Sequence, residues 1–134
     1  MDYQLINIKT IPTEGAGQLS FYEATRDIPF EIKRQYYITG VPEGQIRGFH
    51  AHKKLQQLLF CPYGKIEIIL DDGKHRESVI LDGPEKGLVL TGGLWREMLW
   101  QQTDSVLCVD VSDFYTEDDY IRDYDAYLQY ASQH

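Results

Sequence analysis

The sequence predicts an all-β protein: a double-sheet jelly-roll barrel that forms one domain over residues 1–134 and ends in an α-helix. Short apolar and aromatic runs alternate with turn residues such as Pro62, Gly64, Asp72 and Gly73, and residues of this kind mark the ends of strands. The turns recur at intervals of roughly ten residues, which is typical of antiparallel sandwiches and barrels. A chain of 134 residues is long enough to bury one hydrophobic core.

Eight strands are expected, because eight segments are rich in β-branched, aromatic and other apolar residues. They span residues 5–11, 30–38, 55–61, 65–70, 77–82, 87–93, 96–102 and 105–111. The first of them, LINIKTI, has no obvious partner next to it in the sequence. It can therefore pair within its own sheet or exchange with a second copy of the chain.

The single expected helix covers about residues 116–130. Thr116 can cap it, and three acidic residues follow in its first turn, where negative charge is favourable. Apolar side chains then recur at helical spacing, at Tyr120, Ile121, Tyr124 and Leu128. We expect this apolar stripe to pack on the outside of the barrel.

The composition argues against several classes of protein. The formal net charge is −8, which disfavours a general nucleic-acid binder. No apolar run approaches the roughly 20 residues that cross a bilayer. The N-terminal segment MDYQLINIKT lacks the basic and apolar regions of a signal peptide, so we expect a cytoplasmic protein. Cys61 and Cys108 lie in apolar strand-like runs, which favours buried free thiols, although the sequence also allows a disulfide.

Basic residues group apart from the acidic C-terminal region. Arg47, Lys53 and Lys54 surround two histidines. A local basic cluster beside a pocket favours a small anionic ligand, and we expect Arg47 to take part in binding. For the two lysines the sequence leaves two interpretations open, namely anion binding or a solvated strand edge that discourages aggregation.

The segment from Gly44 to Gly64 carries the most informative motif. It reads Gly44, five residues, His50-x-His52, four residues, Gln57, six residues, Gly64. This spacing is similar to that of the first motif of cupin barrels, in which two histidines and a glutamate bind a metal ion. Here Gln57 stands at the position of the glutamate and offers a neutral carbonyl oxygen, which is a weaker ligand for a divalent cation.

The second cupin motif has also lost its ligand. Met98 stands where a fourth ligand, a histidine, is expected, and Arg96 adds a fixed positive charge two residues earlier. A thioether is a poor donor for iron, manganese or zinc. We therefore expect neither a bound metal ion nor any other cofactor.

Two histidines without a metal can exchange protons with a substrate. Imidazole titrates near neutral pH, so it can accept a proton and return it within one turnover. Alternate residues of a strand face the same side, which brings the rings of His50 and His52 together. The alternative is that both are core histidines with backbone partners. Arg47 in the same segment favours the chemical role.

The segments RGFHAHKKLQQLL, KIEIILDDG and SDFYTEDDYIRDYDAYL together resemble the sugar-nucleotide 3,4-ketoisomerases of the cupin superfamily. The similarity covers nearly the whole chain. It implies a metal-free enzyme that acts on thymidine-diphosphate-linked (dTDP-linked) 4-keto-6-deoxyglucose and moves the carbonyl group from carbon 4 to carbon 3. It also implies a homodimer whose N-terminal strands exchange, and a product used to make 3-amino-3,6-dideoxy sugars for surface polysaccharides, glycoproteins or antibiotics.

The resemblance and the residue types together suggest the site. We expect His52 to be the base that removes the proton from carbon 3 and His50 to shuttle protons between the two oxygens, with the reverse order left open. The expected substrate-binding residues are Arg47, Tyr37, Gln57, Arg96, Lys53 and Ala16. Many family members have His in place of Arg96, and some have Arg near the position of Ala16.

The configuration at carbon 4 of the product depends on these last two positions. A guanidinium holds its proton at neutral pH and therefore positions a sugar more readily than it protonates one, so we favour the gluco over the galacto configuration. Two other functions stay open, a metal-free cupin nucleotide-sugar epimerase and a non-catalytic sugar-nucleotide-binding module. The lost ligands disfavour a metal-dependent oxygenase.

Overall fold

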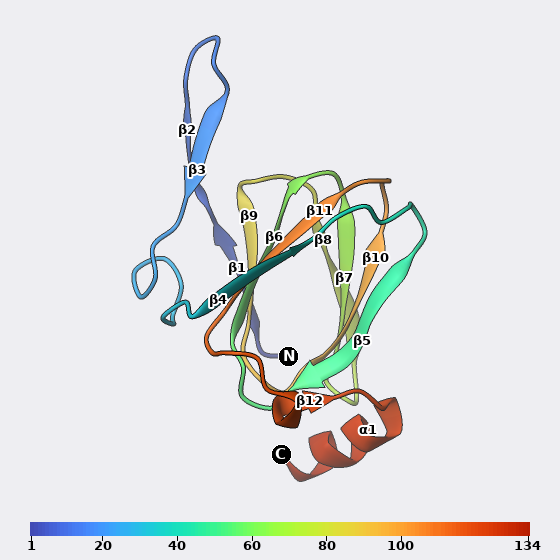
Figure 1. The fold of residues 1–134 in the computed structure, drawn as a ribbon. Helices are drawn as coiled ribbons and strands as arrows, with labels where there is room; N and C mark the ends of the chain where they lie inside the picture. Colours follow the sequence, from blue (N-terminus) through green and yellow to red (C-terminus); the bar gives the residue numbers. More distant parts are fainter.

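The computed structural model describes residues 1–134 and consists mainly of strands, with one α-helix near the C-terminus (Figure 1). The strands are β1 (Tyr3–Asn7), β2 (Lys9–Pro12), β3 (Gln18–Phe21), β4 (Arg34–Ile38), β5 (Ile46–His52), β6 (Gln57–Tyr63), β7 (Ile66–Asp71), β8 (Arg76–Leu81), β9 (Lys86–Leu90), β10 (Trp95–Trp100), β11 (Val106–Val111) and β12 (Tyr120–Ile121). The helical elements are the 3-10 helix η1 (Glu117–Asp119) and the α-helix α1 (Tyr124–Gln133). The predicted all-β class with one C-terminal helix is confirmed.

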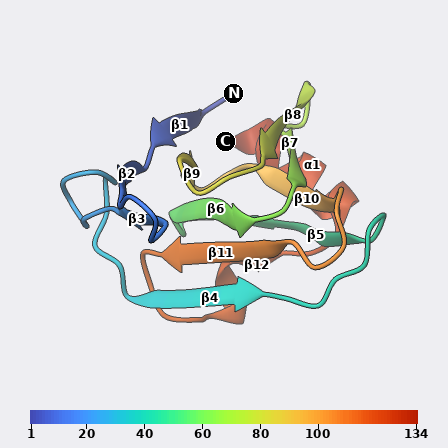
Figure 2. The ribbon, with the colours of Figure 1, turned by 90° about the horizontal axis from the view of Figure 1, so that it is seen from above.

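Two antiparallel sheets of five strands face each other. Their strand orders are β1-β9-β6-β11-β4 and β12-β5-β10-β7-β8, so most neighbours come from distant parts of the chain, as in a jelly roll (Figure 2). Along β6, β7, β10 and β11, side chains alternate between the two faces of the sheet. The inward ones, such as Leu59, Ile68, Trp100 and Val109, form the main hydrophobic core between the sheets.

Two smaller apolar clusters cover the outer faces. The segment before β4 places Ile28 and Phe30 against Leu58 and Val89 on the first sheet. Helix α1 places Tyr127 against Trp95 and its neighbours on the second sheet, and the Tyr127 hydroxyl lies 2.7 Å from the carbonyl oxygen of Gly93. The C-terminal helix thus packs on the outside of the barrel, as its apolar stripe predicted.

The predicted start of this helix is wrong. The helix begins at Tyr124, whereas the sequence pattern placed it over 116–130. Thr116 makes no capping hydrogen bond through its side chain. The cap is Asp123, whose carboxylate accepts a hydrogen bond of 2.9 Å from the backbone N–H of Ala126.

The residues before the helix belong to the barrel instead. Tyr120 and Ile121 form β12, which pairs with His52 and Ala51 of β5. Pairing of this kind requires extended backbone, and it competes with helix formation. The acidic turn that resembled a helix start is the 3-10 helix η1, and it lies beside the histidine strand because of this pairing.

The other strand predictions differ from the structure mainly at their ends. The six predicted strands from 55–61 onward correspond to β6 to β11 within a few residues. The predicted strand 30–38 begins only at Arg34, because the preceding residues pack across the outer face. The histidine strand β5 and the short β3 were not among the eight predicted segments.

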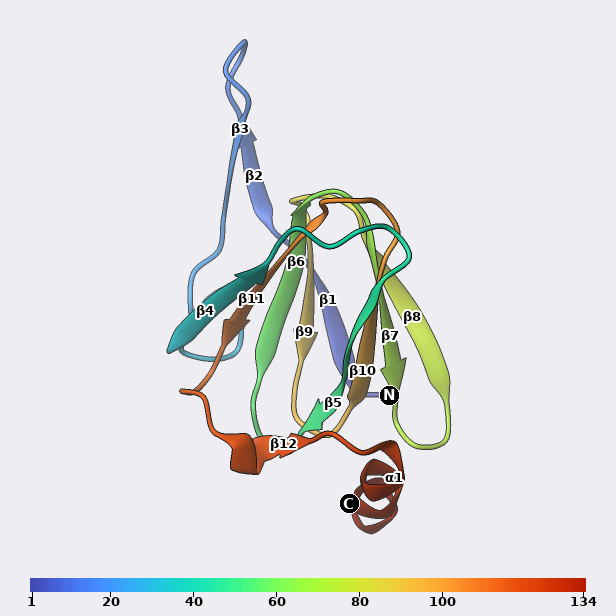
Figure 3. The ribbon, with the colours of Figure 1, turned by 45° about the vertical axis from the view of Figure 1, so that its right-hand side comes forward.

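The N-terminal segment 5–11 divides at Ile8. The part before it continues β1, which pairs with β9 in its own sheet, and the part after it opens β2, which pairs only with β3. The β2–β3 hairpin projects from one end of the barrel, and α1 lies at the opposite end (Figures 1 and 3).

Two further expectations concern the cysteines and membranes. Both cysteines are free, and Cys61 is buried in the core. No helix in the structure has the length and apolar character needed to span a membrane.

Candidate active site

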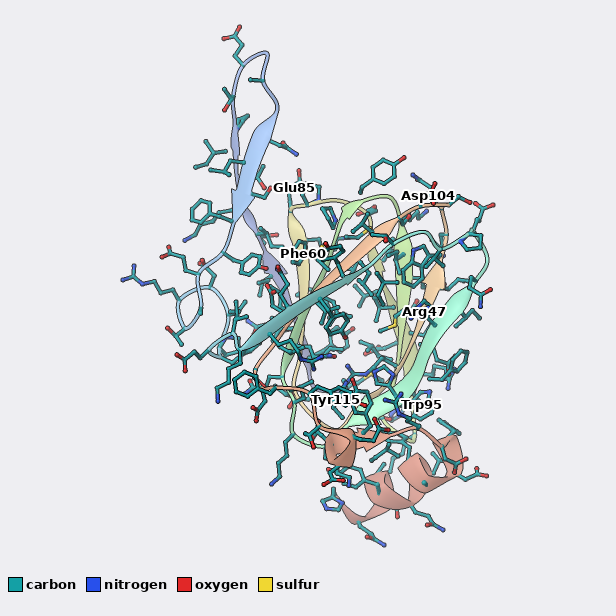
Figure 4. All side chains as sticks on the ribbon, viewed as in Figure 1. Arg47, Phe60, Glu85, Trp95, Asp104 and Tyr115 are labelled. Carbon is teal, nitrogen blue, oxygen red and sulfur yellow. The ribbon has the colours of Figure 1, made fainter.

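A cavity of about 290 Å³ opens where the edge strand β4 of one sheet faces β5 of the other. Another side of the cavity is closed by the C-terminal segment 112–122, which runs from the end of β11 to β12. Figure 4 labels Arg47 on β5 and Tyr115 on this segment. The side chains and one glycine that line the cavity are Arg34, Tyr36, Ile38, Arg47, Gly48, His50, Met98, Tyr115, Tyr120 and Arg122.

A β-bulge in β5 turns two of these side chains, those of Arg47 and His50, toward the cavity. Gly48 and Phe49 have positive φ angles of 99° and 56°, and the register against β10 shifts at this point. In an unbroken strand, Arg47 and His50 would face opposite sides because they are three residues apart. The extra residue of the bulge brings both side chains to the cavity.

The two histidines lie at different depths. His50 lines the cavity, whereas His52 has no exposed surface. The ring centroids are 5.0 Å apart, and the ring of Tyr120 lies 5.3 Å from that of His50 and 4.4 Å from that of His52. Nδ1 of His52 lies 3.2 Å from the carboxylate of Asp119. The paired rings predicted from the His-x-His spacing are therefore present, one behind the other.

Behind the histidines, Arg96 and Gln57 orient a tyrosine. Arg96 is fully buried, and its guanidinium donates hydrogen bonds to the side-chain oxygen of Gln57 and to the carbonyl oxygen of Leu94. Because a guanidinium only donates, Gln57 turns its oxygen toward Arg96 and its amide toward Tyr36. That amide donates to the Tyr36 hydroxyl at 3.3 Å, so the hydroxyl hydrogen of Tyr36 is free for a ligand in the cavity.

The histidines are neutral at pH 7. Burial and, after it, the positive charge of Arg96 lower the pKa of His50 from 6.5 to about 4. The same two causes, in the same order, lower the pKa of His52. Burial lowers the pKa of Arg96 to about 10, so this residue stays charged at neutral pH. A neutral imidazole can accept a proton, which is the state that a general base requires.

Three guanidinium groups give the cavity a positive charge. Arg122 is paired with Glu117 at 2.6 Å, and Arg34 lies over the ring of Tyr115. Arg47 forms no ion pair in the structure and is exposed at the mouth. A concave, positively charged site of this kind attracts an anionic ligand even though the whole chain has a net charge of −8.

Three predicted site residues lie neither on the cavity wall nor among the buried side chains of His52, Gln57 and Arg96 next to it. Tyr37 is 68% exposed, because the alternation along β4 turns Tyr36 inward and its neighbour outward. Lys53 donates from Nζ to the carbonyl oxygen of Asp118 at 3.1 Å and borders a separate pocket of about 500 Å³. Ala16 lies in the loop of the projecting β2–β3 hairpin. The structure does not bring these residues to the cavity of the same chain.

Several residues that line the cavity are not among the predicted site residues. Arg34, Tyr36 and Ile38 alternate along β4 and share one face, and this period-two signal is visible in the sequence RQYYI. The sequence alone does not show which face of this strand turns inward, so it does not distinguish Tyr36 from the predicted Tyr37 as the tyrosine that lines this cavity. Tyr120 and Arg122 are not among the predicted site residues because the sequence pattern predicts a helix over about residues 116–130.

The geometry does not resemble a metal centre. No group of three or more His, Cys, Asp or Glu side chains is arranged to hold a metal ion. The oxygen of Gln57, at the position of a cupin ligand, is bonded to the Arg96 guanidinium, whose charge repels cations.

Comparison with known proteins identifies the family. The family model FdtA, described as "WxcM-like, C-terminal", matches residues 1–132. The TDP-4-oxo-6-deoxy-alpha-D-glucose-3,4-oxoisomerase of Aneurinibacillus thermoaerophilus is 43% identical over 133 residues, which are 99% of this chain and 95% of that protein. The chain belongs to the FdtA family of cupin 3,4-ketoisomerases.

Solved structures of FdtA-family enzymes superpose closely on this chain. A 3,4-ketoisomerase from Helicobacter canadensis has 42% identity and a TM-score of 0.94, with 98% of both chains covered. A sugar 3,4-ketoisomerase from Thermoanaerobacterium thermosaccharolyticum, solved in complex with TDP, has 41% identity and a TM-score of 0.94, with 98% of this chain and 95% of that chain covered. The FdtA-family fold is therefore common to relatives that are named as sugar ketoisomerases.

Proposed function

We propose that this chain converts dTDP-4-keto-6-deoxyglucose to dTDP-3-keto-6-deoxyglucose without a metal ion or another cofactor. The observation that carries the proposal is the pair of neutral histidines, His50 on the wall of a cavity lined by three guanidinium groups and His52 buried next to it. The cations suit a diphosphate, and the imidazoles suit removal of a proton beside a carbonyl. A histidine-to-asparagine mutant of the T. thermosaccharolyticum enzyme was solved with TDP-4-keto-6-deoxyglucose, which supports the same substrate here.

His50 lines the cavity, whereas His52 is buried next to it. We therefore favour His50 as the base, which reverses the order expected from the sequence. His50 removes the proton from carbon 3, the electron pair forms a double bond to carbon 4, and the carbonyl electrons move to oxygen 4. His52 then carries the proton of the carbon 3 hydroxyl to oxygen 4. A proton added to carbon 4 collapses the enediolate to the ketone at carbon 3.

The groups around the histidines supply the remaining parts of the reaction. Tyr36 is the donor to carbon 4, since its hydroxyl hydrogen is left free by the bond from Gln57. The proton that His50 took from carbon 3 then returns to the Tyr36 phenolate through solvent in the cavity, which restores both groups for the next turnover. Arg96 stabilises the negative charge of the enediolate from behind the histidines. Arg47, which forms no ion pair of its own, binds the diphosphate.

We favour the gluco configuration at carbon 4 of the product. The chain is 40% identical to the TDP-quinovose 3,4-ketoisomerase of Campylobacter jejuni and 32% identical to the TDP-fucose-3,4-ketoisomerase of the same organism. Quinovose has the gluco and fucose the galacto configuration. A 3-keto sugar is a suitable substrate for an aminotransferase, which supports a role of the reaction in the synthesis of 3-amino-3,6-dideoxy sugars for surface polysaccharides, glycoproteins or antibiotics.

Proton NMR of the enzyme with dTDP-4-keto-6-deoxyglucose in deuterated water tests this function. We expect the carbon 3 proton signal to disappear while a 3-keto species with deuterium at carbon 4 forms. The same reaction in ordinary water is expected to report the configuration at carbon 4 through the coupling between the carbon 4 and carbon 5 protons. Exchange at carbon 3 without a new ketone would instead indicate an epimerase. Broadened thymidine signals without any exchange would indicate a binding module.

The projecting hairpin supports a homodimer. Ile11 and Leu19 lie opposite each other on β2 and β3 and are 52% and 61% exposed. Apolar side chains on an unpartnered strand pair favour coverage by another chain, and exchange of the hairpin would place Ala16 on the partner subunit. Light scattering is expected to give twice the chain mass of 15.6 kDa, and an aspartate at both positions is expected to give the single-chain mass. A wild-type mass of one chain at micromolar concentration would contradict the dimer.

A further inference from the structure

We propose that Asp119 is a positioning residue that fixes the tautomer of His52, with the proton on Nδ1 and the lone pair of Nε2 directed to the substrate. The inference deepens the proposed function, in which His52 carries a proton between two oxygens. Asp119 is the last residue of η1 and lies far from the histidine motif in the sequence.

The hydrogen bonds of the Asp119 carboxylate are all with the chain that runs from His52 into the next turn. Its Oδ2 lies 3.2 Å from Nδ1 of His52. Its Oδ1 accepts a hydrogen bond of 2.8 Å from the backbone N–H of Lys54, and Oδ2 accepts one of 3.3 Å from that of Leu55. The backbone hydrogen bonds hold the carboxylate in one orientation. Asp119 thereby fixes the direction of the imidazole ring.

The carboxylate determines which ring nitrogen carries the proton. An ionised carboxylate only accepts hydrogen bonds, so His52 must donate from Nδ1. Burial and the charge of Arg96 keep the pKa of this imidazole low, and a neutral ring has a single N–H. With the proton on Nδ1, the other nitrogen is an acceptor.

That acceptor has no partner within the protein. Nε2 of His52 is buried and makes no hydrogen bond, and the whole side chain has no exposed surface. A buried polar atom without a partner is costly, and such atoms are most often completed by water or a ligand. A substrate hydroxyl that reaches past His50 would supply the missing donor. This is the contact that a shuttle from oxygen 3 to oxygen 4 requires.

Asp119 also matters at the moment of transfer. When His52 holds the transferred proton, its ring is positively charged in a region that already contains Arg96, with Arg34 and Arg122 nearby. Asp119 is the carboxylate in direct contact with the ring. It therefore stabilises the transient imidazolium that the surrounding arginines disfavour.

The first measurement uses the wild-type protein without substrate. In ¹⁵N NMR, protonated and unprotonated ring nitrogens give separate resonances, and His52 is expected to show a single tautomer with the proton on Nδ1. Asp119→Asn is expected to produce a mixture of tautomers, because an amide can either donate or accept. A wild-type His52 with its proton on Nε2 overturns the proposal, whether or not the variant folds.

Turnover gives the second measurement. Asp119→Asn is expected to lower kcat by about 10²-fold or more, as loss of the correct tautomer does in other His–carboxylate pairs, with a smaller change in KM. Asp118→Asn removes the same charge from the neighbouring, exposed residue of η1, whose side chain makes no hydrogen bond in the structure, and is expected to leave kcat unchanged. A folded Asp119→Asn with wild-type kcat overturns the proposal. Because the tautomer is read without substrate, a different reaction for the enzyme would leave that result intact.

Discussion

Replacing His50 with asparagine is expected to lower kcat by about 10³-fold, because the variant loses the group that removes the proton from carbon 3. Asparagine retains a polar group of similar size but no basic nitrogen. Binding of TDP, measured by calorimetry, is expected to stay close to that of the wild type, since Arg47 is retained. The rate is measured from the growth of the 3-keto signal in NMR.

A matched variant separates the two histidines. With His52→Asn, we expect slow exchange of the carbon 3 proton with deuterated solvent to continue while movement of the ketone stops, because the base is present and the oxygen-to-oxygen shuttle is not. With His50→Asn, both processes should stop. The opposite pattern would assign the base to His52, the order expected from the sequence.

Replacing Gln57 with glutamate restores the residue of the cupin metal motif and is expected to lower kcat by about 10²-fold. The new carboxylate would form an ion pair with Arg96 and accept the hydroxyl hydrogen of Tyr36. The positive charge that stabilises the enediolate would then be neutralised, and the proton donor would point away from the cavity. Steady-state kinetics with dTDP-4-keto-6-deoxyglucose provides the measurement.

The same substitution is expected to change the pH profile. The pKa of His50 is lowered to about 4 by burial and then by Arg96, while Arg122 lowers it further and Glu117 raises it. A carboxylate at position 57 favours the protonated imidazole, so the acid limb of kcat/KM should move to higher pH by about one unit. Gln56→Glu, which adds the same charge at the preceding position, is the control. If both variants keep the wild-type pH profile, the charge of Arg96 does not lower the pKa of His50.

The barrel and the pair of histidines on one strand could be predicted from the sequence because they depend on local patterns. Turns recur along the chain, and the His-x-His spacing puts two rings on one face of a strand. The positive charge beside the lost metal ligands could also be predicted, since Gln57 stands at the position of the motif glutamate and Arg96 lies two residues before the position of the fourth ligand. Which ring borders the cavity could not, because that depends on where the opposite wall lies.

The other site residues depend on tertiary contacts that no local pattern encodes. Arg47 reaches the cavity only because two residues with positive φ form a bulge. A positive φ is uncommon for a bulky residue such as Phe49, so the sequence does not predict this bulge. Tyr36 and Tyr37 are equivalent by residue type, and only the packing of β4 distinguishes them. The segment around Asp119 has a strong helix-start pattern, and its pairing with β5 overrides that preference.

The crossing of the C-terminal segment over the barrel mouth has a consequence for the protein while it is being made. Both histidines are in place once β5 has paired with β10. The residues that follow the last long barrel strand in the chain include Tyr115, Asp119, Tyr120 and Arg122. Synthesis proceeds from the N-terminus, so these residues leave the ribosome after the barrel strands. A nascent chain that has reached only Val111 therefore contains both imidazoles without the wall that encloses a substrate or the carboxylate that orients one of them, and catalytic competence arises only once the segment after Val111 has been made and has paired with β5.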